Sequence, residues 1–222
     1  MASRFVKFGL CAGLLSLSPL LLAAPVAAQS FGSPLTGLLG KASDSALTKL
    51  AQPGAFMRDD AVRIMLPGPL RKMSGLMKFA DQSGVTSGLS KSINDAAGMA
   101  ADAAKPIFHS AISNISLKDA PAIVGKSDGA TQYLRTSAGA ALAARIRPLV
   151  ASALGRTGAF AQLDKVGASG MLSSAGISRD GLTGSVTDQT MNGIFKYMGT
   201  EETRMRSDPM SVGKKLFGGF GH

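Results

Sequence analysis

The chain contains few of the residues on which common active sites depend. Among its 222 residues are one cysteine, two histidines, two tyrosines and no tryptophan. A single cysteine, Cys11, cannot form a disulfide within the chain, and without partner cysteines the usual zinc-site patterns are missing. His222 is the last residue, so a Ser-His-carboxylate triad would depend on His109, and the sequence has no G-x-S-x-G elbow. We therefore expect no metal site, no cofactor and no familiar hydrolase site.

The first 28 residues have the layout of a secretory signal peptide. Arg4 and Lys7 form a positively charged start, an apolar stretch follows to about residue 24, and Val26-Ala27-Ala28 supplies small residues before Gln29. Gly, Ser and Pro residues interrupt the apolar stretch and no stop-transfer cluster follows it, which favours cleavage over a retained transmembrane helix. We expect a protein of the periplasm or a secreted protein, with no membrane span after cleavage near Ala28.

Cleavage changes the composition of what remains. Cys11 leaves with the leader, so the mature chain, residues 29–222, is free of cysteine. The leader carries two of the 24 basic residues and none of the 14 acidic ones, which leaves the mature chain basic, with a net charge of +8. The basic residues are spread out and aromatic residues for base stacking are few, so we expect no nucleic-acid partner. Attraction to an anionic envelope surface explains the charge better, and a basic surface that only aids solubility is the alternative.

The remaining composition predicts an all-α fold. Alanine, glycine and serine are abundant and the chain has 11 methionines, so we expect helices packed through small residues with Leu, Ile, Met and Phe side chains between them. The one β-like run, residues 61–66, is too short and solitary to make a sheet. We predict a single helical domain over residues 29–222, with six to eight helices and one short extended segment rich in proline.

In the first half of the chain, apolar residues three and four apart place three helices. The first begins at Ser33-Pro34, with Ser33 as its cap, and ends before Gln52. A loop and the extended segment 62–69 follow, and a second helix starts near Pro69. The third covers about residues 86–113 and is kinked or split at Pro106, whose ring removes a backbone hydrogen bond.

The second half of the chain predicts a short helix from Ser116 and a long one from residue 128 or 129 to 154, bent or interrupted near Pro148. The long helix contains a run of alanine and glycine, residues 138–144, which suits close approach of another helix. A shorter helix follows around residues 160–166. We predict little structure over residues 167–184, then a helix capped by Ser185 or Thr187, and a terminal helix that restarts at residues 208–209.

Three ordered blocks of residues stand out along the mature chain. The first is Asp60-Ala61-Val62-Arg63-Ile64, followed by Leu66-Pro67 and Leu70. The second holds Lys118-Asp119-Ala120, Ile123 and Gly129–Arg135, and the third holds Val186-Thr187, Met191–Phe195, Glu201-Glu202 and Arg204–Pro209. Together these blocks resemble an exported bacterial family, the domain of unknown function 4197, over residues 35–217. The resemblance implies an exported, mostly helical protein of unassigned activity and supplies no catalytic residues. Met65 stands where the family has its first proline, and Asn192 where it has an aspartate.

The most suggestive polar set is Arg63, Asp119, Tyr133 and Arg135, because the blocks that contain these residues could converge in the fold. If they meet at a pocket, the two arginines could grip an anionic substrate. If they are buried together, they form a hydrogen-bonded network that pins the extended segment to the helices, which is the interpretation we favour.

The acidic residues form no clear metal loop. Glu201 and Glu202 are adjacent, and neighbouring residues on a helix point about 100° apart, so the pair does not place two ligands on one face. With Arg204, Arg206 and Asp208, it is predicted to be a solvated, charged helix end.

Export, basic charge and the missing catalytic groups favour a non-enzymatic protein that binds an envelope component, whether a partner protein, an anionic polymer or a lipid. One alternative is an enzyme that acts on an anionic substrate through the Arg/Asp/Tyr set. Another is a carrier of a small apolar ligand, because Met and Leu are abundant.

Overall fold

A computed structural model describes residues 27–68, 85–115, 125–167 and 178–208, and every regular element in these ranges is a helix. The helices are α1 (Ala27–Leu50), α2 (Ala55–Arg58), α4 (Val85–Ala103), α5 (Lys105–Ser113), α7 (Gly129–Arg156), α8 (Ala159–Gly167) and α10 (Arg179–Ser207). Residues 63–67 have no helix and join α2 to the rest of the chain. The all-α single domain is therefore confirmed.

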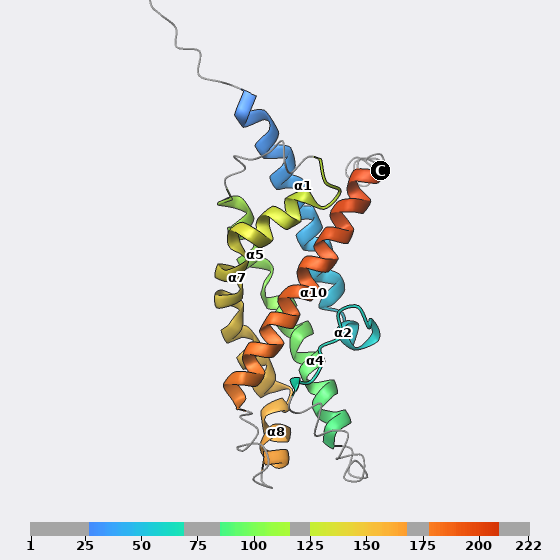
Figure 1. The fold of residues 1–222 in the computed structure, drawn as a ribbon, viewed down its shortest axis with the longest axis vertical. Coiled ribbons are helices and arrows are strands. Elements are labelled where there is room, and N and C mark those ends of the chain that lie inside the picture. The colour runs from blue at the N-terminus through green and yellow to red at the C-terminus, as the bar shows by residue number, and fades with distance from the viewer. Residues whose placement is uncertain (1–26, 69–84, 116–124, 168–177, 209–222) are drawn as a thin grey trace, which may run out of the picture.

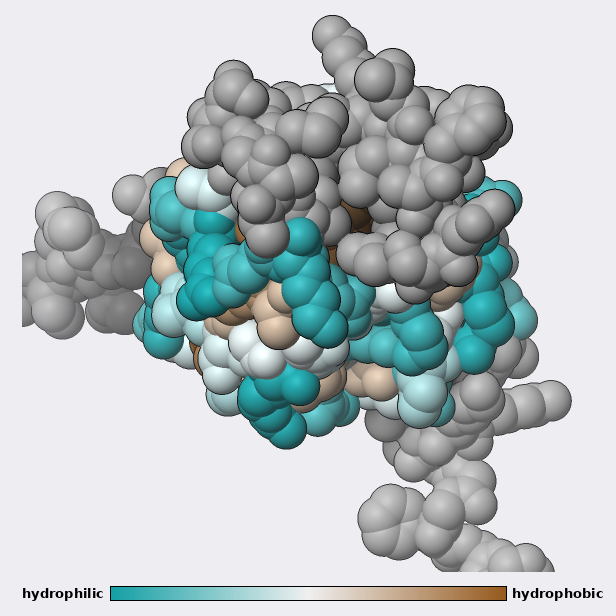
Figure 2. All heavy atoms as spheres, turned by 90° about the horizontal axis from the view of Figure 1, so that it is seen from below, coloured by the Kyte–Doolittle hydropathy of each residue, from teal (hydrophilic) through white to brown (hydrophobic). Residues whose placement is uncertain are grey.

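The helices form an elongated bundle in which α10 crosses most of the length (Figure 1). Helix α10 packs most extensively against α7 and α1, while α4 packs against α7, α2, α8 and α1. Helix α5 fills the space between α1 and α7. Viewed from below, the described surface is largely hydrophilic, with only small, scattered apolar patches (Figure 2). The long helices thus turn their apolar faces to one shared core.

The core combines large side chains with a face of alanines. Phe108 and Phe195 meet edge to face, with ring centroids 5.9 Å apart. Around them pack fully buried leucines and isoleucines from α1, α4, α7 and α10. Helix α4 presents its small side chains to the same core, namely Ala96, Ala97, Ala100, Ala101 and, at its end, Ala104. Packing through small residues is therefore realised chiefly on α4.

Two glycines lie where a neighbouring element comes close to a helix backbone. A Cβ atom on Gly98 would lie 3.3 Å from the Leu50 carbonyl oxygen, and one on Gly193 would lie 3.1 Å from Cε1 of Phe56. The alanine-glycine run of α7, which we expected to make such an approach, is different: a Cβ on Gly139 would meet only ordinary contacts, the nearest at 3.8 Å. The end of α1 and the α2 turn therefore approach a neighbouring helix more closely at a glycine than anything does at Gly139 of α7.

Prolines act as expected at one site and not at another. Helix α4 ends at Ala103 and α5 begins at Lys105, with Pro106 in its first turn, where the missing N–H costs no helical hydrogen bond. The predicted split at Pro106 is confirmed. In contrast, α7 continues through Pro148, so the predicted interruption there does not occur.

Two helix starts differ from the prediction. Helix α1 begins at Ala27, ahead of Ser33, in a stretch whose alanines and glutamine favour helix. Helix α10 begins at Arg179, because Ser178 caps it by accepting a hydrogen bond from the Gly181 N–H at 3.0 Å. The hydroxyl of Thr187 instead donates to the Thr183 carbonyl within the helix.

Several predicted elements lie outside the described residues. They are the leader up to residue 26, the helix near Pro69, the short helix from Ser116 and the terminal helix beyond residue 208. Ala27 and Ala28, the last residues of the predicted leader, are the first two of α1.

Candidate functional site

A surface groove of about 1130 Å³ lies between α7, α10 and the segment of residues 61–63. Most side chains along it are polar. It is lined by four cations, Arg63, Arg135, Lys196 and Arg204, and by one acidic residue, Asp128. Positive charge therefore dominates the groove.

Arg63 is held in place by the turn that precedes it. Its Nε and Nη2 atoms donate to the Met57 carbonyl oxygen at 3.0 and 2.8 Å, and Nη2 lies 2.9 Å from the Asp60 carboxylate. These contacts tie the extended segment to α2. The favoured prediction was a buried network of Arg63 with Asp119, Tyr133 and Arg135; the Arg63 side chain is instead 38% exposed, and it bonds to a backbone carbonyl and Asp60.

Arg135 bridges the two helices that wall the groove. Its Nη2 atom donates to Oδ1 of Asn192 at 2.6 Å, and its guanidinium carbon lies 5.8 Å from the centroid of the Phe195 ring. Contact with the aromatic face fixes the plane of the guanidinium. The amide of Asn192 is neutral, so this neighbour leaves the positive charge of Arg135 uncompensated.

The structure brings together two of the four predicted site residues. Arg63 and Arg135 line the same groove. Tyr133 is not part of its lining and packs, half-buried, against the hydrophobic core. Asp119 lies outside the described residues. The described part of the predicted set is thus an arginine pair that reaches the groove from separate elements.

Two amide side chains clamp the extended segment that leads into the groove. Asn94 of α4 accepts from the Ile64 N–H at 2.9 Å and donates to the Ile64 carbonyl at 3.0 Å. Gln189 of α10 does the same for Met65, at 2.8 and 3.0 Å. Each amide therefore makes the two hydrogen bonds that a neighbouring β-strand would make. These bonds satisfy the backbone N–H and C=O groups of a segment that pairs with no strand among the described residues.

Glu202 was predicted to be solvated, and that prediction is wrong. Its side chain is fully buried (0% exposed) and accepts hydrogen bonds from the Ala130 and Thr131 N–H groups at 3.0 and 2.7 Å. Arg206 donates to the same carboxylate at 2.7 Å. Glu202 thus supplies the acceptor that the first N–H groups of α7 need, and its negative charge meets the positive end of that helix.

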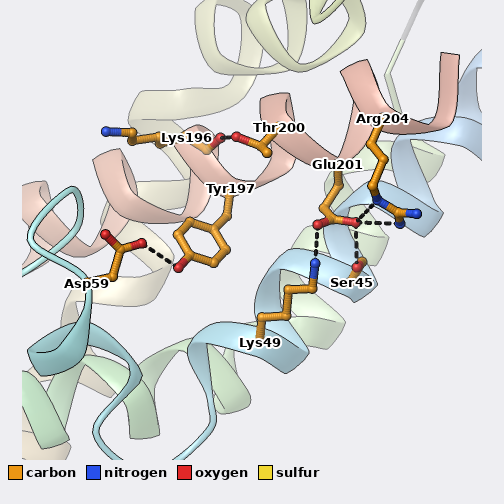
Figure 3. A network of polar contacts seen from close by, with 8 residues as sticks. All are labelled: Ser45, Lys49, Asp59, Lys196, Tyr197, Thr200, Glu201 and Arg204. Atoms are coloured by element: carbon orange, nitrogen blue, oxygen red, sulfur yellow. Dashed lines mark hydrogen bonds and ion pairs between the residues drawn. The ribbon is translucent and has the colours of Figure 1, made fainter. Parts of the chain in front are cut away.

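Glu201 is also buried, at 2% exposure, and points to another neighbour. It binds α1 through Ser45, whose hydroxyl donates at 2.8 Å, and through Lys49, while Arg204 donates from its own helix at 2.7 Å (Figure 3). Burial alone would raise the pKa of Glu201, but hydrogen bonds from Lys49, Arg204 and Ser45 outweigh it and lower the pKa to about 2. The side chains of the two adjacent glutamates point about 100° apart around α10 and therefore bind two different helices.

A third polar contact fixes the turn before the extended segment. The Tyr197 hydroxyl donates to the Asp59 carboxylate at 2.6 Å, and the Ala61 N–H donates to the same carboxylate at 2.9 Å. The hydrogen bond to Asp59 raises the pKa of Tyr197 to about 12, and the same bond lowers the pKa of Asp59. Lys196, on the same helix, extends to the Asp59 side of the view in Figure 3; its charge also lowers the pKa of Asp59, and it lines the groove.

The core stripe of α10 contains the signal that would have placed the glutamates. Its buried apolar residues are Met191, Ile194, Phe195 and Met198, and the next positions at spacings of three and four are Glu201 and Glu202. Continuing the stripe through the charged residues predicts their burial. Polar character alone was the wrong guide.

A second hollow, of about 1070 Å³, lies between α1, α2 and α4. Methionines contribute to its lining, which makes it the place where a small apolar ligand would fit best. Two ion pairs also line it, however: Lys91 with Asp95 at 2.5 Å and Lys105 with Asp102 at 2.7 Å. An apolar ligand would have to cover these charges.

Within the described ranges, no three His, Cys, Asp or Glu side chains are grouped so as to hold a metal ion. His109 lies at the surface, where its Nε2 atom is 2.7 Å from the Asp44 carboxylate. None of the described helices is both long and apolar enough to span a membrane.

A family model described as "Protein of unknown function (DUF4197)" matches residues 26–219. The chain belongs to this family. No curated protein and no solved structure matches it. In this DUF4197 chain, the first and third signature blocks meet in space, because the segment with Arg63 packs against α10. The groove is therefore built where separate parts of the DUF4197 sequence come together.

Proposed function

We propose that this DUF4197 protein is a non-enzymatic binding protein of the bacterial envelope that takes an anionic component into the groove between α7 and α10. The observation that carries the proposal is the convergence of Arg63, Arg135, Lys196 and Arg204 on one groove, where Asp128 is the single acidic residue among those that the structure describes. Such a concave, positively charged surface attracts anions and concentrates them locally.

Two of the four cations carry a positive charge that no ion pair neutralises among the described residues. Arg135 bonds to the neutral amide of Asn192, and Lys196 donates to the Ala61 carbonyl at 3.4 Å and attracts the Asp59 carboxylate without forming an ion pair with it. Neither forms an ion pair within the part of the chain that the structure describes. Arg63 and Arg204 are already paired with Asp60 and Glu201. They therefore strengthen the positive potential of the groove and help to orient an anion, but neither is free to pair with it. An incoming anion would find its partners at Arg135 and Lys196.

Three carboxylates near the groove are already engaged by the protein itself, which supports binding over catalysis. Glu202 is occupied by the N-terminus of α7, Glu201 by Ser45 and Lys49, and Asp59 by Tyr197. A general base has to be within reach of substrate and able to exchange a proton. These groups hold helices together instead.

Location in the envelope rests on the sequence. The signal-peptide layout of residues 1–28 predicts export, and anionic lipids and polymers are common in the envelope that an exported protein enters. A basic groove is suited to that environment.

The test compares retention of envelope material by three forms of the immobilised mature chain. They are the wild type, the groove variant Arg135→Gln/Lys196→Gln and the charge-matched control Arg145→Gln/Arg156→Gln, whose changes lie on exposed positions of α7 outside the groove. We expect the wild type and the control to retain phosphate- or uronate-containing material that salt releases, and the groove variant to lose most of it. Equal retention by all three forms, or none above a blank resin, would contradict the proposal.

A further inference from the structure

The groove follows α10 over much of its length. Its α10 lining begins at Gln189, recurs every three or four residues and ends at Ser207. At about 1.5 Å of rise per residue, these two positions lie about 27 Å apart along the helix. A site for one small anion would use a single turn, so this groove has the dimensions of a binding surface for a chain.

The cations lie at successive levels along this length. Arg135 reaches the level of Asn192, to which it donates; Lys196 is one turn further and Arg204 two turns beyond that. The levels of Asn192 and Arg204 are about 18 Å apart on the helix. A single phosphate or carboxylate could contact one level at a time, whereas a chain of such groups could contact Arg135 and Lys196 together and extend to the positive potential around Arg204.

The groove also has a direction. Past Arg135 a smaller hollow of about 280 Å³ continues between α7 and α10, and Arg135, Asn192 and Phe195 line both. Among the described residues, the smaller hollow adds the acidic Asp188 and no cation. The path from Arg135 towards Arg204 also holds an acidic residue, Asp128, which lies beside Gly199 and is bonded by Gln132. That path contains Lys196 and Arg204 as well, so it is the more positively charged direction for an anionic chain.

From this geometry we propose that the ligand is an extended anionic polymer, with repeating phosphate or carboxylate groups, lying along α10 from Arg135 to Arg204. The inference rests on the proposed function and specifies its ligand. Arg135 anchors one end of the chain, because its guanidinium is oriented by Asn192 and Phe195 before the ligand arrives. Lys196 contacts the next repeating groups.

A polymer fits the groove better than a protein segment or a bilayer. Binding of a peptide usually depends on buried apolar anchors in pockets. Here the apolar lining residues Val62 and Phe195 are each only 5% exposed, so they offer no such pocket. A bilayer is flat at this scale and would not enter a groove between two helices, whereas a single polymer strand would.

The experiment measures the affinity of the mature protein for anions of graded length by isothermal titration calorimetry. The phosphate series consists of orthophosphate, tripolyphosphate and longer inorganic polyphosphates, and oligogalacturonates provide the carboxylate series. We expect the affinity to rise at least tenfold from the monomer to chains that span about 18 Å and then to level off. The tighter series identifies the repeating group.

Single substitutions locate the binding. Arg135→Gln and Lys196→Gln are each expected to weaken binding of the long chain at least fivefold and to make it less dependent on salt. The control Arg145→Gln, which removes one charge from the same helix as Arg135, is expected to change the affinity less than twofold. Thermal melting of each variant confirms that it is folded.

Four results would overturn the inference. One is that orthophosphate binds as tightly as a long chain, which would leave the proposed function standing with a compact ligand. Another is that Arg145→Gln weakens binding as much as Arg135→Gln. A third is that an acidic peptide or single-stranded DNA of equal charge binds more tightly than the polymers. The fourth is that no polymer binds although the groove-dependent retention of envelope material persists; the inference then fails and the proposed function survives.

Discussion

Residues of the same type that are adjacent in the sequence can bind different elements of this protein. Glu201 and Glu202 are neighbours of the same type, yet one binds α1 and the other the N-terminus of α7. Both carboxylates are buried and saturated with donors. Removal of one partner from a buried ionic contact usually costs several kcal/mol, because the remaining charge is left without a partner.

Glu202→Gln should lower the free energy of unfolding by about 3 kcal/mol. The substituted amide has only one acceptor atom for two α7 N–H groups, and Arg206 loses its anionic partner. Urea denaturation followed by circular dichroism measures the change. Asp188→Asn, the same chemical change at an exposed position of α10, is the control and should shift the value by less than about 0.5 kcal/mol. Equal effects at both sites would show that the burial of Glu202 does not matter.

Stability should fall between about pH 4.5 and 2 as Glu201 becomes protonated. The pKa of this group is lowered from 4.5 to about 2 in the folded protein, so its stabilising contribution is complete above pH 4.5 and disappears as the pH drops through the folded value. The lowered pKa of Asp59 adds a dependence of the same sign. Melting temperatures across this range measure it.

Glu201→Gln provides the comparison for the pH measurement. The variant should be less stable than the wild type at pH 7, and its melting temperature should vary less with pH below 4.5, because one of the titrating groups is gone. A variant as steeply dependent on pH as the wild type would assign the acid sensitivity to other carboxylates.

At the scale of elements, close packing depends on where side chains are missing. Gly193 of α10 lies under Phe56 of α2 and Val62 of the extended segment, so α10 needs a glycine at that point. This contact also sets the position of Arg63, which follows Val62, against the groove. Packing of one glycine thereby affects the shape of the binding surface.

Gly193→Ala should destabilise the protein by about 1–2 kcal/mol, because the added methyl group must displace Phe56 from a contact of 3.1 Å. Its matched control is Gly37→Ala in α1, where nothing lies within 4 Å of the new atom. Alanine favours helix over glycine by up to about 1 kcal/mol, so the control should be more stable than the wild type. Chemical denaturation of both variants measures the difference, and stabilisation by both would contradict this account of the packing.

The elements themselves were partly predictable from local chemistry. Pro106 divides α4 from α5 as its ring requires, and Phe160 and Leu163 lie in a short helix as their spacing indicates. The start of α10 was placed too late because Ser185 and Thr187 also resemble caps. Ser178 serves as the cap, and glycines at 181 and 184 did not prevent helix formation, since the buried stripe of α10 stabilises it.

At the scale of the whole molecule, the prediction concerns export. Expression of the full chain in a bacterial host should yield an envelope-located product that starts at Gln29, because Val26-Ala27-Ala28 presents small residues to the signal peptidase. Intact mass and N-terminal sequencing measure the cleavage point. Ala28→Arg should block processing and Ala28→Gly should preserve it. An unprocessed wild-type chain in the cytoplasm would contradict both the leader and the proposed location.

The sequence alone determined the features that depend on local or additive properties. Helical periodicity and composition specified the all-α class, ring geometry specified the break at Pro106, and three blocks of residues specified the family. The excess of basic residues was likewise a property of composition. None of these requires knowledge of which helices touch.

Only the tertiary structure decided which polar groups face a groove and which are buried. Arg63 and Arg135 are 72 positions apart in the chain, and they share a groove because the extended segment and α7 both pack against α10. Glu201 and Glu202 are buried because two other helices present donors to them there. A charged side chain is stable inside a protein only where hydrogen-bond or ionic partners lie within reach. Contacts between elements distant in the sequence decide where such partners lie.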